Sequence, residues 1–373
     1  MNTTKRKIAC ITNIPSPYNV DLFWFLNQYS SQYKFFPVYT NDTEDNRKWE
    51  ADKNRLENSV ILHSRVIKLK TALDQRYIHI PPSLEPTLNE IDPEAVIAWE
   101  YNIAALQAMH WCKKHHRKFI HVTEGTLHSE RDLNAVQKWS RKRIIRHADG
   151  WIATSTKAKE KLVYWEAPQD KIFTALLTVD ITSFLKQDYS PIPGRILYVG
   201  SFAKRKGLDL LFEALPYIKE PYELHIVGDG DQSEKKQLQQ ILERTGSADN
   251  VKWIGYREGE SLRKEYREAA VFVLPTREDC FGLVLAEALA AGNWIVSSKY
   301  ADGAYDVVKP GMNGVIIDPE NAKEFAEAIC SALPFAEDRR SENEEIINSF
   351  RYETIAKHYY ECLNVTLSDS KNE

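Results

Sequence analysis

The segment from residue 271 to 298 constrains the fold more than any other part of the chain. An apolar, strand-forming run over 271–274 ends at a proline and predicts a buried strand. A polar turn follows, then a run of helix formers over 282–291, with Gly292 where a helix-ending glycine belongs. Residues 294–297 predict the next strand. We expect a β-α-β unit whose first loop lies at the carboxyl end of a strand, where open α/β sheets bind ligands.

One charged residue, Glu287, stands in the otherwise apolar helix predicted over 282–291. The apolar residues leave this helix no polar face, so we expect it to be buried on most sides. A buried carboxylate is costly unless a partner satisfies it. Two interpretations are open. Glu287 lies at an edge or in a salt bridge to a neighbouring loop, or it accepts hydrogen bonds from the hydroxyls of a ligand.

Asp279 lies in the loop before this helix. The backbone N–H groups near Cys280, Phe281, Gly282 and Leu283 should face outward at the positive end of the helix dipole. Such a helix N-terminus suits a phosphate or an oxygen-rich ligand. One acid, these amides and a second acid further along the helix together predict a site that holds a sugar, a diphosphate and a ribose in a row.

The spacing of Asp279 and Glu287 resembles the acid-x7-acid motif of retaining glycosyltransferases of family 4, which have the GT-B fold. The resemblance implies that the first acid contacts the donor sugar, that the following amides hold sugar and phosphate, and that the second acid binds the ribose. The register set by Phe281 and Gly282 places Asp279 where the family usually has Glu. Glu278 is adjacent, one position out of register.

A second loop, over 200–207, carries three consecutive cationic residues after a predicted strand. It resembles the family's G-R-x-x-x-x-K-G loop, whose Arg and Lys hold the donor diphosphate. Lys206 matches the Lys, but Ser201 stands at the Arg position, so Arg205 or Lys204 is expected to supply the second charge. Without the β-α-β unit that follows, such a loop would more often be a solvated turn.

Two further loops complete the donor side that the resemblance implies. One begins with Gly228 after a predicted strand, and the other, with Tyr256 and Arg257, resembles the loop that frames the nucleotide base. The expected donor-binding residues are Gly200, Ser201, Arg205, Lys206, Gly228, Tyr256, Arg257, Asp279, Cys280, Phe281, Gly282, Leu283 and Glu287.

The first loop of the chain, over 13–18, follows a strand predicted over 7–12 and contains two prolines. The prolines favour an extended loop where an NAD-binding domain would have its glycine-rich turn, which argues against that cofactor. The PSPYNVD sequence resembles a sub-group of family-4 transferases in which this loop faces the acceptor, which implies acceptor binding by Pro17 and Tyr18. A rigid structural turn is the alternative.

Acidic residues follow two more predicted strands of the first part of the chain. Glu100 comes after the strand over 95–98, and Glu124 and His128 follow the strand over 119–122. We expect the two acids to bind or activate an acceptor hydroxyl, and His128 to bind donor phosphate or acceptor. The neighbouring Glu130 equally suits the start of a helix. The candidate catalytic residues are Asp279, Lys206, Glu287, Glu124 and His128.

Two basic clusters, over 113–118 and 138–146, are typical of solvated helix ends or faces. The second has Trp139, Ile144 and Ile145 interleaved, so contact with a membrane surface is the other interpretation.

The composition excludes several classes of protein. A net charge of −4 and a pI near 6.2 argue against a nucleic-acid binder that relies on phosphate contacts. The apolar run near the N-terminus breaks within a few residues and predicts a first strand, not a signal peptide, and no stretch is long enough to span a membrane. The five cysteines have no metal-binding spacing and predict reduced thiols in a cytosolic protein.

We therefore expect an α/β protein of GT-B fold, with two facing, doubly wound, Rossmann-like domains and the active cleft between them. The predicted domains are an acceptor-binding domain over 1–186, a donor-binding domain over 195–350, and a C-terminal helix and tail over 351–373 that return to the first domain. The best linker is the polar, proline-containing stretch over 187–194.

The expected function is transfer of a hexose from a UDP- or GDP-linked sugar to an acceptor hydroxyl, with retention at the anomeric carbon. The resemblance implies that the acceptor is a growing surface glycan or a lipid-linked sugar, as in polysaccharide, O-antigen or glycolipid synthesis. No Asp-x-Asp sequence is placed to carry a metal, so we expect none. The expected location is the cytoplasm, with or without peripheral contact at the membrane face. The alternatives are a non-hydrolysing sugar-nucleotide epimerase and a non-catalytic sugar-nucleotide-binding subunit.

Overall fold

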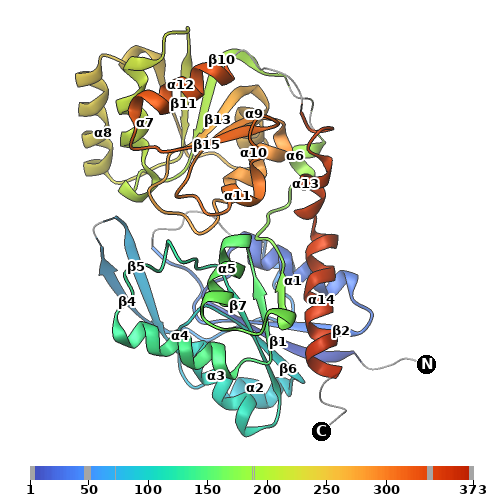
Figure 1. Cartoon of the computed structure of the whole chain (residues 1–373). Coiled ribbons are helices and arrows are strands. Elements are labelled where there is room, and N and C mark those ends of the chain that lie inside the picture. The colour runs from blue at the N-terminus through green and yellow to red at the C-terminus, as the bar shows by residue number, and fades with distance from the viewer. Residues whose placement is uncertain are drawn as a thin grey trace. The chain divides into compact units, whose positions relative to one another are not determined.

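The computed structural model describes residues 5–45, 52–71, 73–186, 188, 190–333 and 339–368 (Figure 1). The chain divides into two compact units. The first consists of Met1–Thr71, Gln75–Asp180 and Tyr352–Glu373, and the second of Ala72–Asp74 and Ile181–Arg351. The chain thus passes from the first unit into the second after Asp180, whereas the sequence placed this boundary at residue 186.

The first unit is built on a parallel sheet of seven strands in the order β3-β2-β1-β6-β7-β8-β9, beside a separate antiparallel pair, β4 and β5. Its strands are β1 Arg6–Thr12, β2 Tyr33–Tyr39, β3 Val60–Ile61, β4 Arg65–Lys70, β5 Gln75–Ile80, β6 Ala95–Trp99, β7 Lys118–Thr123, β8 Gly150–Ala153 and β9 Ile172–Thr174. Its helices are α1 Pro17–Tyr29, α2 Glu85–Ile91, α3 Ile103–Lys114, α4 Ala135–His147, α5 Thr156–Tyr164 and α14 Tyr352–Ser368.

Both faces of this sheet are buried, which is why its central strands are almost continuously apolar. Residues of α2, α3, α4 and α5 share one apolar cluster with the sheet, and residues of α1 and α14 share the other. The C-terminal helix therefore crosses back to the first unit, as expected from the sequence. Tyr352 stacks on Phe25 with ring centroids 4.3 Å apart, and the Tyr360 hydroxyl donates to the Leu26 carbonyl at 2.7 Å.

The second unit is built on a parallel sheet of six strands in the order β12-β11-β10-β13-β14-β15. Its strands are β10 Ile192–Val199, β11 Glu223–Val227, β12 Val251–Gly255, β13 Ala269–Leu274, β14 Trp294–Ser298 and β15 Gly314–Ile317. Its helices are α6 Thr182–Leu185, α7 Leu208–Ala214, α8 Gln232–Thr245, α9 Gly259–Glu268, α10 Val284–Ala291, α11 Ala304–Val307, α12 Ala322–Ala332 and α13 Glu344–Ser349.

The β-α-β unit expected from the sequence is formed by β13, α10 and β14, whose strands pair in parallel. Gly292 ends α10 with φ +91°, in the left-handed region that glycine adopts at little cost. The helix begins at Val284, later than predicted, because Gly282 still has φ +82° in the preceding loop. All its apolar residues except Val284 are buried, as its composition predicted.

Two parts of the sequence prediction were wrong. The sequence over 60–68 predicts a single strand, but His63, with φ +51°, separates β3 from β4. β4 then pairs with β5, a strand that the sequence did not reveal because most of its residues are exposed. The stretch expected to be a linker over 187–194 includes the first residues of β10.

The long polar stretch over 41–58 predicts a loop excursion, and it lies partly outside the described residues. In the described part of the chain, no helix has both the length and the hydropathy needed to cross a membrane.

His225, on β11, holds helix α9 to the sheet of the second unit. Its Nδ1 lies 2.6 Å from a Glu265 oxygen and its Nε2 lies 2.7 Å from a Glu223 oxygen. The side chain is buried, and both ring nitrogens can donate only when the imidazole is protonated. The hydrogen bond to Glu265 is the main cause that raises the pKa of His225, against the opposing effect of burial.

We predict that His225→Gln destabilises the second unit more at pH 6 than at pH 9. Because folding raises the pKa of His225, its stabilisation is complete below the unfolded pKa of about 6.5 and is lost as pH rises through the folded pKa. Hydrogen bonds to charged groups contribute about 1.5–3 kcal/mol each, which sets the expected scale at pH 6. Thermal melts of both proteins across this range check it. An equal loss at both pH values would contradict the imidazolium.

Candidate functional site

The loops after β10 and β13 bring together the two residues on which the donor-side prediction depended. These strands are neighbours in the sheet, so their carboxyl ends lie side by side. Lys206, after β10, places its Nζ 2.5 Å from an Oδ2 of Asp279, after β13. Their side chains are 18% and 13% exposed, so the ion pair is largely shielded from water and still reachable.

Asp279 is held in its ionised form by the cations around it. Burial raises the pKa of Asp279, but Lys206 and then Arg205 outweigh burial and hold it below the usual value. An Arg205 Nη1 lies 3.7 Å from the same carboxylate oxygen. The Asp279 carboxylate therefore lies between the Lys206 ammonium and the Arg205 guanidinium at the carboxyl edge of the sheet.

Arg205 is partly occupied by other partners. Its Nε donates to Asp74 at 2.8 Å, and its Nη1 donates to the Glu278 carbonyl at 2.9 Å. Glu278 therefore offers its backbone, while Asp279 offers its carboxylate, to the cationic loop. Of these two cations, Lys206 lies closer to the Asp279 carboxylate.

Backbone contacts fix the cationic loop against the loop that carries Asp279. Gly207 has φ +71°, and any side chain there would overlap the carbonyl oxygen of Pro275. The Arg277 amide and the Thr276 hydroxyl both donate to the Arg205 carbonyl at 2.8 Å. The guanidinium of Arg277 also binds both carboxylate oxygens of Asp209, at 2.7 and 2.8 Å. The two loops are thus held as one rigid surface.

The N-terminus of α10 lies beside Asp279, but one of the amides expected to face a ligand already has a partner. The Phe281 amide donates to an Asp279 Oδ1 at 3.3 Å. The helix has no side-chain N-cap, and Gly282 and Leu283 accept bonds from the first helical amides through their carbonyls. The Phe281 amide therefore departs from the expectation that the amides over 280–283 face outward. Gly303 fits directly against the Phe281 carbonyl, where any side chain would overlap.

Glu287 has a protein partner that the sequence prediction missed. The Tyr266 hydroxyl, from α9, donates to a Glu287 Oε2 at 2.7 Å. Burial raises the pKa of Glu287 to about 7, and the bond from Tyr266 acts in the opposite direction. One interpretation of Glu287 was a salt bridge. The partner found is an uncharged hydroxyl group. Tyr266 lies on the apolar face of α9, where the sequence pattern favours a core residue.

The other expected donor-side residues lie on loops of the same edge at different distances from Asp279. Gly200 follows β10 and Gly228 follows β11, and these glycines let the two loops approach so closely that a side chain at Gly228 would overlap the Gly200 carbonyl. Ser201 is exposed, with its carbonyl bonded by Tyr198. Tyr256 and Arg257 follow β12, which β11 and β10 separate from β13.

The expected acceptor-side residues also gather at one sheet edge, in the first unit. The loops after β1, β6 and β7 carry them, and these strands are neighbours. Pro17 and Tyr18 open α1 after β1, Glu100 follows β6, and Glu124 and His128 follow β7. Arg131 donates to the His128 carbonyl at 2.7 Å. A small cavity at this edge is lined by Tyr18, Asn19, Leu22, Trp99, Thr154, Ala175, Leu176, Leu177, Thr178, Ile355 and Tyr359.

Glu100 has a strained backbone. Its φ is +66°, a left-handed conformation that costs free energy in a residue other than glycine. Its amide donates to the Val122 carbonyl at 3.1 Å, which ties it to β7. Burial raises the pKa of Glu100, and Lys161 opposes that effect.

Three charged residues near this edge were missed as a group. The sequence predicts Glu130 at the start of a helix and Arg141 on a solvated basic face, and it gives Lys161 no role. The signal was present for Lys161, because it stands between Ala158 and Leu162 on the buried face of α5.

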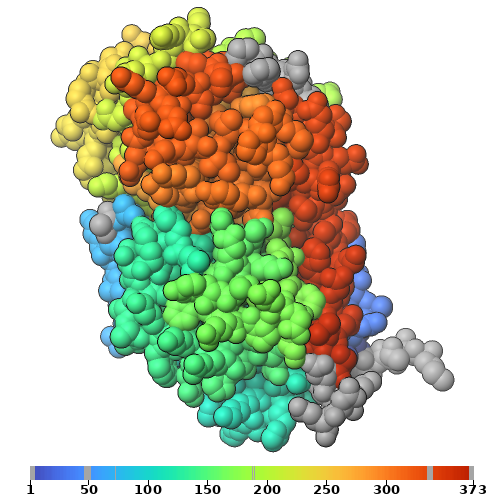
Figure 2. All heavy atoms as spheres, in the orientation of Figure 1, coloured from blue at the N-terminus to red at the C-terminus, as the bar shows by residue number. Residues whose placement is uncertain are grey.

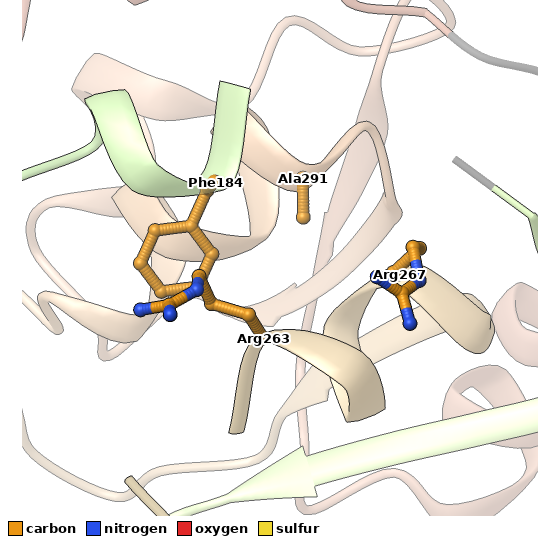
Figure 3. A pocket seen from close by; sticks show the side chains of 4 residues that line it. All are labelled: Phe184, Arg263, Arg267 and Ala291. Atoms are coloured by element: carbon orange, nitrogen blue, oxygen red, sulfur yellow. The ribbon is translucent and has the colours of Figure 1, made fainter. Parts of the chain in front are cut away.

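A recess beside α9 carries none of the expected site residues. Figure 3 shows Arg263 and Arg267 extending from α9 toward it, with Phe184 from α6 and Ala291 from α10 on its other sides. It is too narrow to hold a water molecule, so we do not include it in the candidate site.

We predict that the Glu287 carboxyl titrates near pH 7 and that Tyr266→Phe moves its titration to higher pH. The tyrosine hydroxyl lowers the pKa of Glu287 by binding the ionised form, so its removal leaves burial unopposed. Carboxyl carbon-13 shifts of glutamate-labelled protein check it, with Glu287→Gln to assign the signal. A titration at the ordinary glutamate pKa in both proteins would contradict the burial of this carboxyl.

Comparison with known proteins gives the site a family. Residues 190–347 match the family described as Glycosyl transferases group 1. An uncharacterized glycosyltransferase of Methanocaldococcus jannaschii is 32% identical over 131 residues, 35% of this chain and 33% of that protein. A lipopolysaccharide 1,6-galactosyltransferase of Salmonella typhimurium is 27% identical over 186 residues, 48% of this chain and 51% of that protein. The chain spans 33%, 46% and 60% of the first three curated relatives it matches.

Solved structures match over nearly the whole chain. A lipopolysaccharide outer core galactosyltransferase has a TM-score of 0.74 at 20% identity, covering 96% of this chain and 99% of that one. The Anabaena protein HepE in complex with UDP has a TM-score of 0.75 at 16% identity, covering 97% and 100%. At these identities the likeness shows the fold, which is GT-B. The family match is confined to residues 190–347, so the second unit carries a group 1 glycosyltransferase domain.

Proposed function

We propose that the protein transfers a hexose from a nucleoside-diphosphate sugar to an acceptor hydroxyl, with retention of anomeric configuration. The observation that carries the proposal is the shielded contact of Lys206 with Asp279 beside the N-terminus of α10. This rigid surface presents an ammonium group, an ionised carboxylate and a helix N-terminus. These groups match the three parts of such a donor: diphosphate, sugar hydroxyls and the bond between them.

The proposed chemistry depends on the charge that develops on the departing diphosphate. Lys206 and Arg205 stabilise that charge, together with the positive end of the α10 dipole. Asp279, ionised at neutral pH, accepts a hydrogen bond from a hydroxyl of the donor sugar. Glu287 accepts from the ribose hydroxyls. No metal is assigned a role in this proposal.

The names of the relatives guide the choice of donor. HepE was solved with UDP-glucose, and two of the similar proteins are lipopolysaccharide galactosyltransferases. These names support a UDP-hexose as the first donor to test, ahead of a GDP-hexose. They also support an acceptor that is a surface glycan or a lipid-linked sugar.

The acceptor side is assigned to the first unit. Glu124 and Glu100 are proposed to bind the acceptor hydroxyl, with His128, Pro17 and Tyr18 beside them on loops of the same sheet edge. For a lipid-linked acceptor we also propose peripheral contact with a membrane surface through α4, which lies on the face shown in Figure 2. Its exposed residues include Lys138, Lys142, Arg143, Arg146 and Trp139, the last with 53% of its surface open.

We predict that Lys206→Ala weakens UDP binding at least ten-fold, because the variant removes the cation nearest to the proposed diphosphate site. Asp279→Asn should leave UDP binding within about three-fold and reduce turnover of a UDP-hexose at least ten-fold, because only the sugar is proposed to touch this carboxylate. Titration calorimetry with UDP and a product assay with UDP-glucose and UDP-galactose measure the two effects.

The matched control is Lys299→Ala, which removes a lysine paired at 2.7 Å with Asp318 on the same unit. Normal UDP affinity in Lys206→Ala would remove this residue from the site. Normal turnover in Asp279→Asn together with loss in Glu278→Gln would move the sugar contact to Glu278.

Formation of a new nucleotide sugar without an acceptor would indicate an epimerase, and binding without turnover of any donor would indicate a binding subunit. Turnover that survives EDTA is expected.

We predict that the protein binds vesicles of phosphatidylglycerol and phosphatidylcholine at low salt but not vesicles of phosphatidylcholine alone. Lys142→Glu with Arg143→Glu should abolish this binding, because the outer face of α4 carries several cations and no acidic residue. Lys113→Glu with Lys114→Glu, on the other basic cluster, is the control. Flotation of the vesicles measures binding, and equal loss in both pairs would contradict a specific α4 contact.

A further inference from the structure

Glu130 joins two buried cations in the first unit. Its Oε1 accepts from an Arg141 Nη2 of α4 at 2.9 Å, and its Oε2 lies 3.3 Å from the Lys161 Nζ of α5. The side chains of Glu130 and Arg141 are 10% and 13% exposed, and that of Lys161 is 1% exposed. A single carboxylate thus links two helices through charges that are almost out of contact with water.

The surroundings of Lys161 show that the cluster is built rather than incidental. Its Nζ also donates to the Thr123 hydroxyl, the last residue of β7, at 2.7 Å. The Lys161 ammonium and the Arg141 guanidinium each lie 4.7 Å from the ring centre of Tyr101, which is itself buried. Aromatic faces attract cations, so Tyr101 supports both. Glu130 supplies the anionic partner of Lys161, at 3.3 Å, that a buried ammonium needs.

Glu130 sits in the loop between β7 and α4, which carries the proposed acceptor residues. Thr126 and Ser129 close this loop on itself, with the amide of each donating to the hydroxyl of the other at 2.9 and 3.0 Å. The Glu130 amide donates to the Thr126 carbonyl at 3.1 Å. A side chain at Gly125 would lie 2.6 Å from Glu130 Oε1 and 3.0 Å from Lys161 Nζ, so the loop packs directly on the ion cluster.

We propose that Glu130, held by Arg141 and Lys161, is the positioning residue of the acceptor loop and fixes Glu124 and His128 where they act. This inference rests on the proposed function, because it takes the role of these two residues from it. Glu130 itself acts on the reaction only indirectly, by anchoring the backbone of the loop that carries Glu124 and His128. The charge network replaces the hydrophobic packing that a loop of polar residues cannot supply.

The same cluster surrounds Glu100. Burial is the largest cause that raises the pKa of Glu100, while Lys161 and Arg141 lower it and Glu130 raises it. The strained backbone of Glu100 precedes Tyr101, whose ring lies under both cations. We call Glu130, Arg141 and Lys161 the clamp. The clamp therefore connects two of the three loops of the acceptor edge.

The test compares Glu130→Gln with the wild type in three measurements. Amide hydrogen exchange over 125–131 should accelerate at least ten-fold, while exchange in β7 over 119–122 stays unchanged. The dissociation constant for UDP should change less than two-fold. Transfer from UDP-hexose to p-nitrophenyl hexosides, used as probe acceptors, should show an acceptor KM raised at least five-fold with an unchanged donor KM. A residue needed only for folding would not separate the two KM values.

Additional variants keep the proposal testable if Glu130→Gln folds poorly. Arg141→Met leaves the Lys161 pair in place and should give a weaker form of the same effects, and Arg141→Lys should restore much of the loss. Asp92→Asn removes a carboxylate that is paired with Arg117 at 2.7 Å on the same unit and serves as the matched control.

The outcomes separate the clamp from the proposed function. Unchanged loop exchange in both Glu130→Gln and Arg141→Met would overturn the clamp. Faster loop exchange with an unchanged acceptor KM would overturn its positioning role. A wild type that neither binds UDP nor turns over any donor would instead count against the proposed function, and hydrogen exchange would still decide whether Glu130 anchors the loop.

Discussion

An ammonium and a carboxylate 2.5 Å apart, on loops that follow neighbouring strands, are the contact on which the second unit's candidate site depends. Partial burial makes each charge costly alone, so the pair and the loops that carry it stabilise one another. Gly207 and the paired Arg277 and Asp209 fix the two loops, and with them the charges, relative to each other. That preorganisation is what an electrostatic mechanism requires.

The sequence predicted the elements whose signals are local. The strand, helix and strand around α10 follow from apolar runs and one glycine. The contact of Lys206 with Asp279 depends on β10 and β13 being neighbours, which only the sheet order shows. The hairpin of β4 and β5 was not predictable in this way. The hairpin lies outside both main sheets and most of its residues are exposed, so its alternating Ile67, Leu69, Ile78 and Ile80 mark no buried face.

The partners of buried charges were hidden from the sequence for a related reason. The burial of Glu287 was predicted from its apolar neighbours, but the hydroxyl that satisfies it belongs to Tyr266, on a different helix. Lys161 meets Thr123 across 38 positions of the chain. Periodicity shows that a polar side chain faces the core, and only tertiary structure shows which group meets it there.

The return of α14 to the first unit makes that unit discontinuous along the chain. Ile355, Tyr359 and Leu363 cover an apolar face to which β1, α1 and β2 contribute from the opposite end of the sequence. During synthesis, the whole second unit is made before the residues that cover this face. The first unit to be translated is therefore the last to complete its core, and the second unit is free to fold ahead of it.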